Sequence, residues 1–270
     1  MSATPEIAKA RVRELLLRAA DRAGLEVRRR GRGVRRTLTE VLEHYAALGV
    51  APATLVDVGV AAGTPVLYDA FPHARRLLVE PLREWEPTLR DLVAAAPTGS
   101  AYELCAAGPQ PGELEIGVHR VLACSSMVGD RAGDGADVER RVVPVRRLDD
   151  VVAAHGLDDG RPVVLKADVE GAELEVLKGA PATLERTQLV LLEVSLFALN
   201  PGGAQLAEVV GWMAEHGWAV ADLYDGHVRP LDGQLAQIDI AFTREDGPLR
   251  ADHRYARPEQ ADALYRSWGL

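Results

Sequence analysis

The chain has 270 residues, of which 47% are hydrophobic and 26% are charged. This length suits one large α/β domain with a short appendage, and the apolar content excludes a wholly disordered chain. No apolar run approaches the ~18 residues that cross a bilayer. The charged N-terminus lacks the apolar core of a signal peptide, and two cysteines do not make a disulfide framework. We therefore expect a cytoplasmic protein without a membrane partner.

The charge of the chain is unevenly distributed. The formal net charge is −9, yet residues 1–40 hold 11 Lys/Arg and 5 Asp/Glu, so the remaining 230 residues hold 20 and 35. An acidic body repels phosphate backbones, so we expect no nucleic-acid partner. The basic run from Arg28 to Arg36 is either a solvated arm against the acidic body or a docking arm for an acidic partner or anionic substrate.

The first 50 residues carry a helical pattern. Apolar residues at helical spacing predict a helix over roughly 5–23 and a second over 37–48, which ends before Gly49. We expect residues 1–50 to form a helical arm or lid with an Arg-rich linker. The same helices are candidates for a homodimer contact.

From Pro52 onward, predicted strands and helices alternate. Short apolar runs predict strands at 54–60, 75–81, 100–108, 161–168, 188–195, 218–224 and 237–243. Helical patterns lie between them at about 82–96, 171–179 and 204–216. This alternation predicts a parallel sheet with helices on both faces. We assign this main domain to 51–245 and a C-terminal tail or helix to 246–270.

The region 109–147 interrupts the alternation. Two strand-like runs, 113–121 and 139–148, flank a loop over 129–137 that is rich in Gly and Asp. We interpret the region as an insertion, either a β-hairpin or a lid beside the site.

The loop after the first predicted strand indicates a ligand site. Asp57, Gly59 and Gly63 form a D-x-G-x-x-x-G pattern, in which small residues let a ligand approach the backbone. Ligands of open α/β sheets bind at the carboxyl ends of strands. Residue 61 is Ala, so the dinucleotide pattern G-x-G-x-x-G is missing. Because Asp57 can face the ammonium of a methionine moiety, the loop favours S-adenosylmethionine over NAD. The alternative is a turn that only permits strand–helix packing.

Two further positions follow the neighbouring strands. Glu80 ends the second strand, 21 residues after Gly59, where a carboxylate can accept hydrogen bonds from both ribose hydroxyls. The alternative is a solvated carboxylate at a strand end. Ala106 belongs to the small-residue run 105–108, which can admit an adenine edge.

The stretch 165–180 is the most distinctive part of the sequence. It brings Lys166 and Asp168 to the carboxyl edge of the sheet and puts Glu170 and Glu173 in the first turn of a helix, where the helix dipole favours acids. Asp168 lies beside the expected cofactor, where a carboxylate can hold an ammonium, a metal or a substrate proton. With Glu193, at the end of the fifth strand, it offers oxygen ligands suited to Mg²⁺. No His/Cys cluster supports a transition metal, and we favour a site without any metal.

Assembled, these segments resemble the FkbM-type S-adenosylmethionine-dependent methyltransferases. The resemblance is carried by LVDVGVAAG (55–63), LLVEP (77–81), VPVRRLDDV (143–151), VVLKADVEGAELEVLKGA (163–180), VLLEVS (190–195) and QIDIAF (237–242). It implies a three-layer Rossmann-like α/β sheet of seven strands, the last antiparallel. It also implies mostly O-methylation, often of sugars or secondary metabolites.

The resemblance also assigns residues. Asp57, Gly59 and Gly63 match the motif that lines the methionine moiety, and Glu80 matches the ribose-binding acid. Further matches are the serine pair of the inserted region, Ser125 and Ser126, and the acidic pair after the fourth strand, Asp168 and Glu170. The chain departs from the family at 60–62, where Val-Ala-Ala stands in place of a frequent polar Asn.

We expect in-line transfer of a methyl group to a hydroxyl of a small molecule. A hydroxyl nucleophile benefits from a general base. Asp168 is the first candidate and Glu193 the second, followed by His227, in the loop between the last two strands, or His119. Two alternatives stay open: an NAD-dependent oxidoreductase, and a non-catalytic protein that binds S-adenosylmethionine.

Overall fold

The computed structural model describes residues 34–119, 138–200 and 202–268, together with Leu16, Ala19 and Arg22. The chain forms two compact units, 1–35 and 36–270. The predicted helix over 5–23 lies outside the described residues except for Leu16, Ala19 and Arg22, which are helical. Within the described ranges, no helix is long and apolar enough to cross a membrane.

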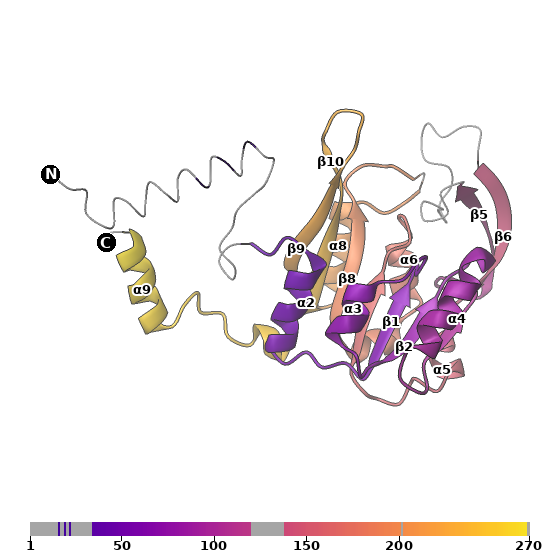
Figure 1. Ribbon diagram of the computed structural model, residues 1–270, viewed down its shortest axis with the longest axis horizontal. Coiled ribbons are helices and arrows are strands. Elements are labelled where there is room, and N and C mark those ends of the chain that lie inside the picture. Colours follow the sequence, from indigo (N-terminus) through magenta and orange to yellow (C-terminus); the bar gives the residue numbers. More distant parts are fainter. Residues whose placement is uncertain are drawn as a thin grey trace. The chain divides into compact units, whose positions relative to one another are not determined.

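A seven-stranded sheet forms the centre of unit 36–270 (Figure 1). Its strands are β1 (Thr54–Val58), β2 (Arg75–Val79), β3 (Ala101–Glu103), β7 (Val163–Ala167), β8 (Thr187–Ser195), β9 (Trp218–Val228) and β10 (Leu235–Arg244). Their order is β3-β2-β1-β7-β8-β10-β9. The neighbours from β3 to β8 are parallel, whereas β10 is antiparallel to both β8 and β9. The predicted sheet, with its last strand antiparallel, is confirmed.

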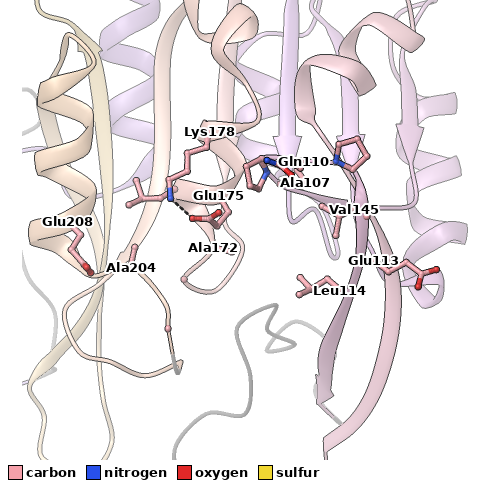
Figure 2. A pocket seen from close by; sticks show the side chains of 17 residues that line it. Ala107, Gln110, Glu113, Leu114, Val145, Ala172, Glu175, Lys178, Ala204 and Glu208 are labelled. Atoms are coloured by element: carbon pink, nitrogen blue, oxygen red, sulfur yellow. Dashed lines mark hydrogen bonds and ion pairs between the residues drawn. The ribbon is translucent and has the colours of Figure 1, made fainter.

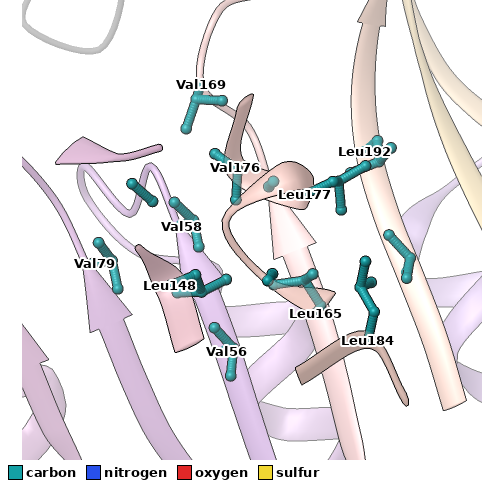
Figure 3. Packing of buried hydrophobic residues seen from close by; sticks show 14 of the residues in the cluster. Val56, Val58, Val79, Leu148, Leu165, Val169, Val176, Leu177, Leu184 and Leu192 are labelled. Atoms are coloured by element: carbon teal, nitrogen blue, oxygen red, sulfur yellow. The ribbon is translucent and has the colours of Figure 1, made fainter. Parts of the chain in front are cut away.

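Helices cover both faces of this sheet, because the side chains of each buried strand alternate between the faces. Leu55 of β1 packs with the helices α2 (Leu38–Ala47), α3 (Pro65–Ala70) and α4 (Glu86–Ala94). Val56 and Val58 face the opposite way and pack with α5 (Leu148–Ala154), α6 (Glu173–Lys178), α7 (Pro181–Glu185) and α8 (Leu206–Glu215). Figure 3 shows this second core around Leu165, Val176 and Leu192. The architecture has the three predicted layers.

The predicted strand over 100–108 divides into β3 and β4 (Ala106–Ala107). β4 leaves the main sheet because it pairs in parallel with β6 (Val138–Arg146), which also pairs with β5 (Gly112–His119) in an antiparallel manner. These three strands form a second sheet in the order β4-β6-β5. β5 and β6 are the predicted inserted hairpin, and the loop over 129–137 lies outside the described residues.

Several predicted helices have different limits in the structure. The pattern over 82–96 becomes a 3-10 turn, η1 (Arg83–Trp85), followed by α4. The pattern over 171–179 becomes α6, and a separate short helix, α7, begins at Pro181, since proline is tolerated at the first helical position. The second N-terminal helix is α2, whose cap Thr37 accepts a hydrogen bond from the Glu40 amide.

The C-terminal region contains a 3-10 turn, η3 (Pro248–Arg250), and the helix α9 (Pro258–Trp268). Like α2, these elements belong to unit 36–270.

Candidate active site

The loop after β1 is built from residues in left-handed backbone conformations. Gly59, Ala61 and Gly63 have φ values of 77°, 44° and 94°. Gly59 is held on both sides: its amide donates to the Val79 carbonyl, and a Cβ added at this position would overlap the backbone carbonyl of Asp168. The tight contact brings the ends of β1 and β7 together, so the loop and Asp168 share one edge of the sheet.

We predict that Gly59→Ala lowers the free energy of unfolding by more than about 3 kcal/mol, because it combines backbone strain with a clash against backbone atoms. Gly49→Ala is the matched control. Gly49 also has a positive φ, 97°, but nothing lies within 4 Å of an added Cβ, so we expect a loss of about 1–2 kcal/mol from strain alone. Urea unfolding measures both. Equal losses in the two variants would contradict the close approach of Gly59 to Asp168.

Glu80 is buried directly after β2 and receives two backbone hydrogen bonds. Its Oε2 accepts from the Ala61 amide at 3.0 Å, and its Oε1 accepts from the Leu82 amide at 3.0 Å. Burial raises the pKa of Glu80, and these two amides work in the opposite direction. The residue that we predicted as the ribose-binding acid therefore also fixes the conformation of the loop after β1.

Asp57 and Lys166 face each other on neighbouring strands. They are register partners in β1 and β7, and the Lys166 Nζ lies 3.9 Å from Asp57 Oδ1 and 3.1 Å from Asp168 Oδ2. The Tyr68 hydroxyl donates to Asp57 Oδ2 at 2.6 Å. Asp57 is fully buried, and its Oδ1 has no hydrogen-bond partner. A buried carboxylate oxygen that accepts no hydrogen bond and has only a distant ion-pair partner can accept one from a cationic ligand.

Asp168 follows β7 at the start of a loop in an unusual conformation. Its amide donates to the Val58 carbonyl, and its side chain is 39% exposed, in contrast to the fully buried Asp57. Glu170 and Gly171 both have positive φ values. The buried Glu173 supports the loop by accepting hydrogen bonds from the amides of Val169 and Gly171, and its burial raises its pKa to about 7. Glu173 thus holds the loop that carries Asp168.

Glu193 lies at the end of β8, opposite Asp239 of β10. The Gln237 side chain donates to Glu193 Oε2 at 2.6 Å, and His227 Nδ1 lies 3.8 Å from Glu193 Oε1. Burial raises the pKa of Glu193, and the negative charge of the nearby Asp168 is the second cause of this rise. The same two causes raise the pKa of Asp239 to about 7, although Lys166 works in the opposite direction. His227 is largely exposed, with 67% of its side chain accessible.

The structure thus brings most of the predicted residues to one edge of the sheet. The members of this edge are Asp57, Gly59, Gly63, Glu80, Asp168 and Glu193, with His227 at its rim. Asp239, Gln237 and Tyr68 belong to the same group, and sequence reasoning missed them. The one signal for Asp239 was a carboxylate at the centre of the apolar run 237–242.

The other predicted residues are not among the described members of this edge. Ala106 is buried in β4, where it packs with Leu82, Ile116 and Val143. Ser125 and Ser126 lie outside the described residues, whereas His119 ends β5. In the part of the chain that the structure describes, no group of three or more His, Cys, Asp or Glu is arranged to hold a metal ion.

A cavity of 590 Å³ lies beside the loop that follows Asp168 (Figure 2). It is lined by the end of β4 with the turn to β5 and the start of β5, by Val145 of β6, by α6 and the two residues before it, and by the segment leading into α8. Its charged side chains are Glu113, Glu175, Lys178 and Glu208, and Lys178 pairs with Glu175 at 2.5 Å. Figure 2 shows Glu208 and Glu113 on opposite sides of this pair. The cavity offers space and polar groups for a small molecule.

Comparison with protein families shows which family the chain belongs to. The model of the methyltransferase FkbM domain matches residues 57–218, which is more than half of the chain and runs from Asp57 to the start of β9. The chain belongs to the FkbM methyltransferase family. The match confirms the resemblance recognised in the sequence. The family assignment supports S-adenosylmethionine as the cofactor, and the NAD-dependent alternative loses its support.

No curated protein matches the chain. Among solved structures, it is similar to the 1,6-didemethyltoxoflavin-N1-methyltransferase of Burkholderia thailandensis, with 12% identity and a TM-score of 0.41 over 90% of this chain and 92% of the other. It is also similar to the N-methyltransferase NodS of Bradyrhizobium japonicum in complex with S-adenosyl-L-homocysteine, with 8% identity and a TM-score of 0.41 over 76% and 85%. Similarity at this level adds nothing to the family assignment.

Proposed function

We propose that this FkbM methyltransferase transfers a methyl group from S-adenosylmethionine to a hydroxyl of a small molecule. The observation that carries the proposal is the meeting of a glycine loop, a buried Asp57 oxygen that accepts no hydrogen bond, and Glu80 at one sheet edge, within the segment that matches the family. This donor set fits the cofactor, because one carboxylate suits an ammonium and the other suits ribose hydroxyls.

The residues of the edge have separate roles in the proposal. When bound, S-adenosylmethionine supplies the electrophilic methyl group. Asp57 contributes a buried negative charge that attracts the cationic methionine moiety. Glu80 binds the ribose: each of its oxygens accepts one backbone amide and keeps a second lone pair for a hydroxyl. The loop over 59–63 exposes backbone instead of side chains to the ligand.

Asp168 is the proposed general base, with Glu193 as the second candidate. The Asp168 side chain is 39% exposed, against 13% for Glu193, so Asp168 is the more accessible of the two to an acceptor. The base takes the proton of the acceptor hydroxyl while the protein holds that oxygen in line with the methyl carbon.

The acceptor is proposed to be a small molecule because of the neighbouring cavity. Its 590 Å³ lies in the range of ~300–1,000 Å³ that small-molecule sites occupy. The cavity lining carries three carboxylates and one lysine, which is already paired. These charges favour neutral or cationic acceptors over phosphates.

The test is methyl transfer from S-adenosylmethionine carrying a labelled methyl group. The purified protein is incubated with a panel of sugars and hydroxyl-bearing secondary metabolites, and the products are analysed by mass spectrometry and NMR. We expect a labelled methyl ether. Label found only on nitrogen would contradict O-methylation. Cofactor binding without transfer to any acceptor would favour the non-catalytic alternative.

A further inference from the structure

Lys166 has a position that the proposed function does not yet explain. It lies in β7 between the carboxylates of Asp57 and Asp168, with only 14% of its side chain exposed. The ammonium donates a hydrogen bond to Asp168 Oδ2 and lies within ion-pair distance of Asp57 Oδ1. The two carboxylates have different roles in the proposed reaction. Asp57 binds the methionine moiety of the cofactor, and Asp168 takes the proton of the acceptor hydroxyl.

Most of the ionisable groups near Lys166 are acidic, although the Arg76 guanidinium lies over the Tyr68 ring. The ionisable groups that face this region are Asp57 of β1, Tyr68 of α3, Asp168, Glu170 and Glu173 of the loop and α6, Glu193 of β8, Tyr224 of β9 and Asp239 of β10. No second lysine or arginine among the described residues pairs with Asp57 or Asp168. Burial works to lower the pKa of Lys166, but Asp168 and Asp57 outweigh it and keep that pKa above its ordinary value. The neighbouring carboxylates therefore favour the charged form of Lys166.

We propose that Lys166 is the positioning residue of this site, and that its ammonium compensates the charge of the Asp57 and Asp168 carboxylates and fixes their orientation. The proposal rests on the proposed function. An ammonium has three donors and no acceptor, so it can hold Asp168 Oδ2 and face Asp57 Oδ1 at the same time. Asp168 Oδ1 is then left for the acceptor, because the other oxygen of this carboxylate is engaged.

The proposal has a consequence for pH that a purely structural lysine lacks. Removing a cation from a group of carboxylates favours their protonated forms. Protonated carboxyls attract a cationic methionine moiety less, so cofactor affinity is lost at a higher pH than in the wild-type protein. The effect of one opposite charge at 3–4 Å is about 1–3 pH units.

The experiment measures the affinity of S-adenosylhomocysteine by calorimetry from about pH 5 to about pH 9, a range that spans the expected shift. Lys166→Met removes the charge and keeps the chain length, whereas Lys166→Arg keeps the charge. Arg186→Met is the control, because Arg186 has the same 14% exposure, lies near the opposite end of the sheet and pairs with Asp159. We expect the midpoint of the acidic loss of affinity to rise by about 1–3 pH units in Lys166→Met. It should return to the wild-type value in Lys166→Arg and stay unchanged in Arg186→Met.

Thermal unfolding over the same pH range tests the proposal without a cofactor. In Lys166→Met the loss of Tm should grow as pH rises, because uncompensated carboxylates ionise and repel one another. In Arg186→Met the loss should be constant, since Arg161 and Arg75 hold the pKa of Asp159 well below its ordinary value and it stays ionised throughout. An unshifted midpoint together with a constant loss of Tm in Lys166→Met would overturn the proposal while leaving the proposed function intact. If the wild-type protein does not bind S-adenosylhomocysteine, both are overturned.

Discussion

Asp57→Asn is expected to weaken S-adenosylhomocysteine binding by about 100-fold, or about 2.7 kcal/mol, which lies within the roughly 2–5 kcal/mol that accompanies loss of one member of a buried charge pair. The substitution is isosteric and its amide oxygen can still accept the Tyr68 hydroxyl, so the side chain keeps its place. The substitution removes the negative charge of the Asp57 carboxylate, whose Oδ1 accepts no hydrogen bond within the protein. Calorimetric titration measures the change.

Asp222→Asn is the matched control for this substitution. Asp222 is also a buried carboxylate that accepts a tyrosine hydroxyl, from Tyr45 at 3.1 Å, but it lies on β9. We expect its variant to keep wild-type affinity even if it loses some stability. Comparable affinity losses in both variants would mean that Asp57 acts through the stability of the fold and not through cofactor binding.

Asp168→Asn is expected to lower the rate of methyl transfer by about 10²–10⁴-fold, the usual contribution of a general base. The affinity for S-adenosylhomocysteine should change far less than the rate. Asparagine retains the size of the side chain and cannot take a proton. The rate is measured with the acceptor that the labelled-methyl panel identifies.

Glu193→Gln tests whether Glu193, the second candidate, acts as the general base in place of Asp168. A base must be deprotonated to act, and burial with the nearby Asp168 raises the pKa of Glu193. If Glu193 is the base, the rate rises with pH through this raised pKa and the rise vanishes in Glu193→Gln. If Asp168 is the base, Glu193→Gln keeps the pH profile and most of the rate. Full activity in Asp168→Asn would remove Asp168 from the mechanism.

The main sheet could be predicted because its central strands are buried on both faces. Such strands appear as short apolar runs, and those around Leu55, Leu165 and Leu191 are fully or almost fully buried. The meeting of Asp57, Asp168 and Glu193 could be predicted for a related reason: the carboxyl ends of neighbouring parallel strands share one edge. The antiparallel direction of the last strand followed from the family resemblance.

The remaining features depend on tertiary structure that a single sequence does not contain. β4 separates from β3 because Ala106 pairs with Val145, which is about 40 residues away. Asp239 joins the site only through the antiparallel register that sets it opposite Glu193. Ala61 has a left-handed backbone conformation, in which its amide donates a hydrogen bond to Glu80. This conformation could not be predicted from the sequence, because alanine rarely adopts it.

Calorimetric titration of the purified wild-type protein with S-adenosylhomocysteine, with NAD as the parallel ligand, tests the central claim most directly. The account predicts saturable binding of S-adenosylhomocysteine at one site per chain and no binding of NAD. Absence of binding by S-adenosylhomocysteine, or preference for NAD, would contradict the assignment of Asp57, Glu80 and the glycine loop to the methyl donor.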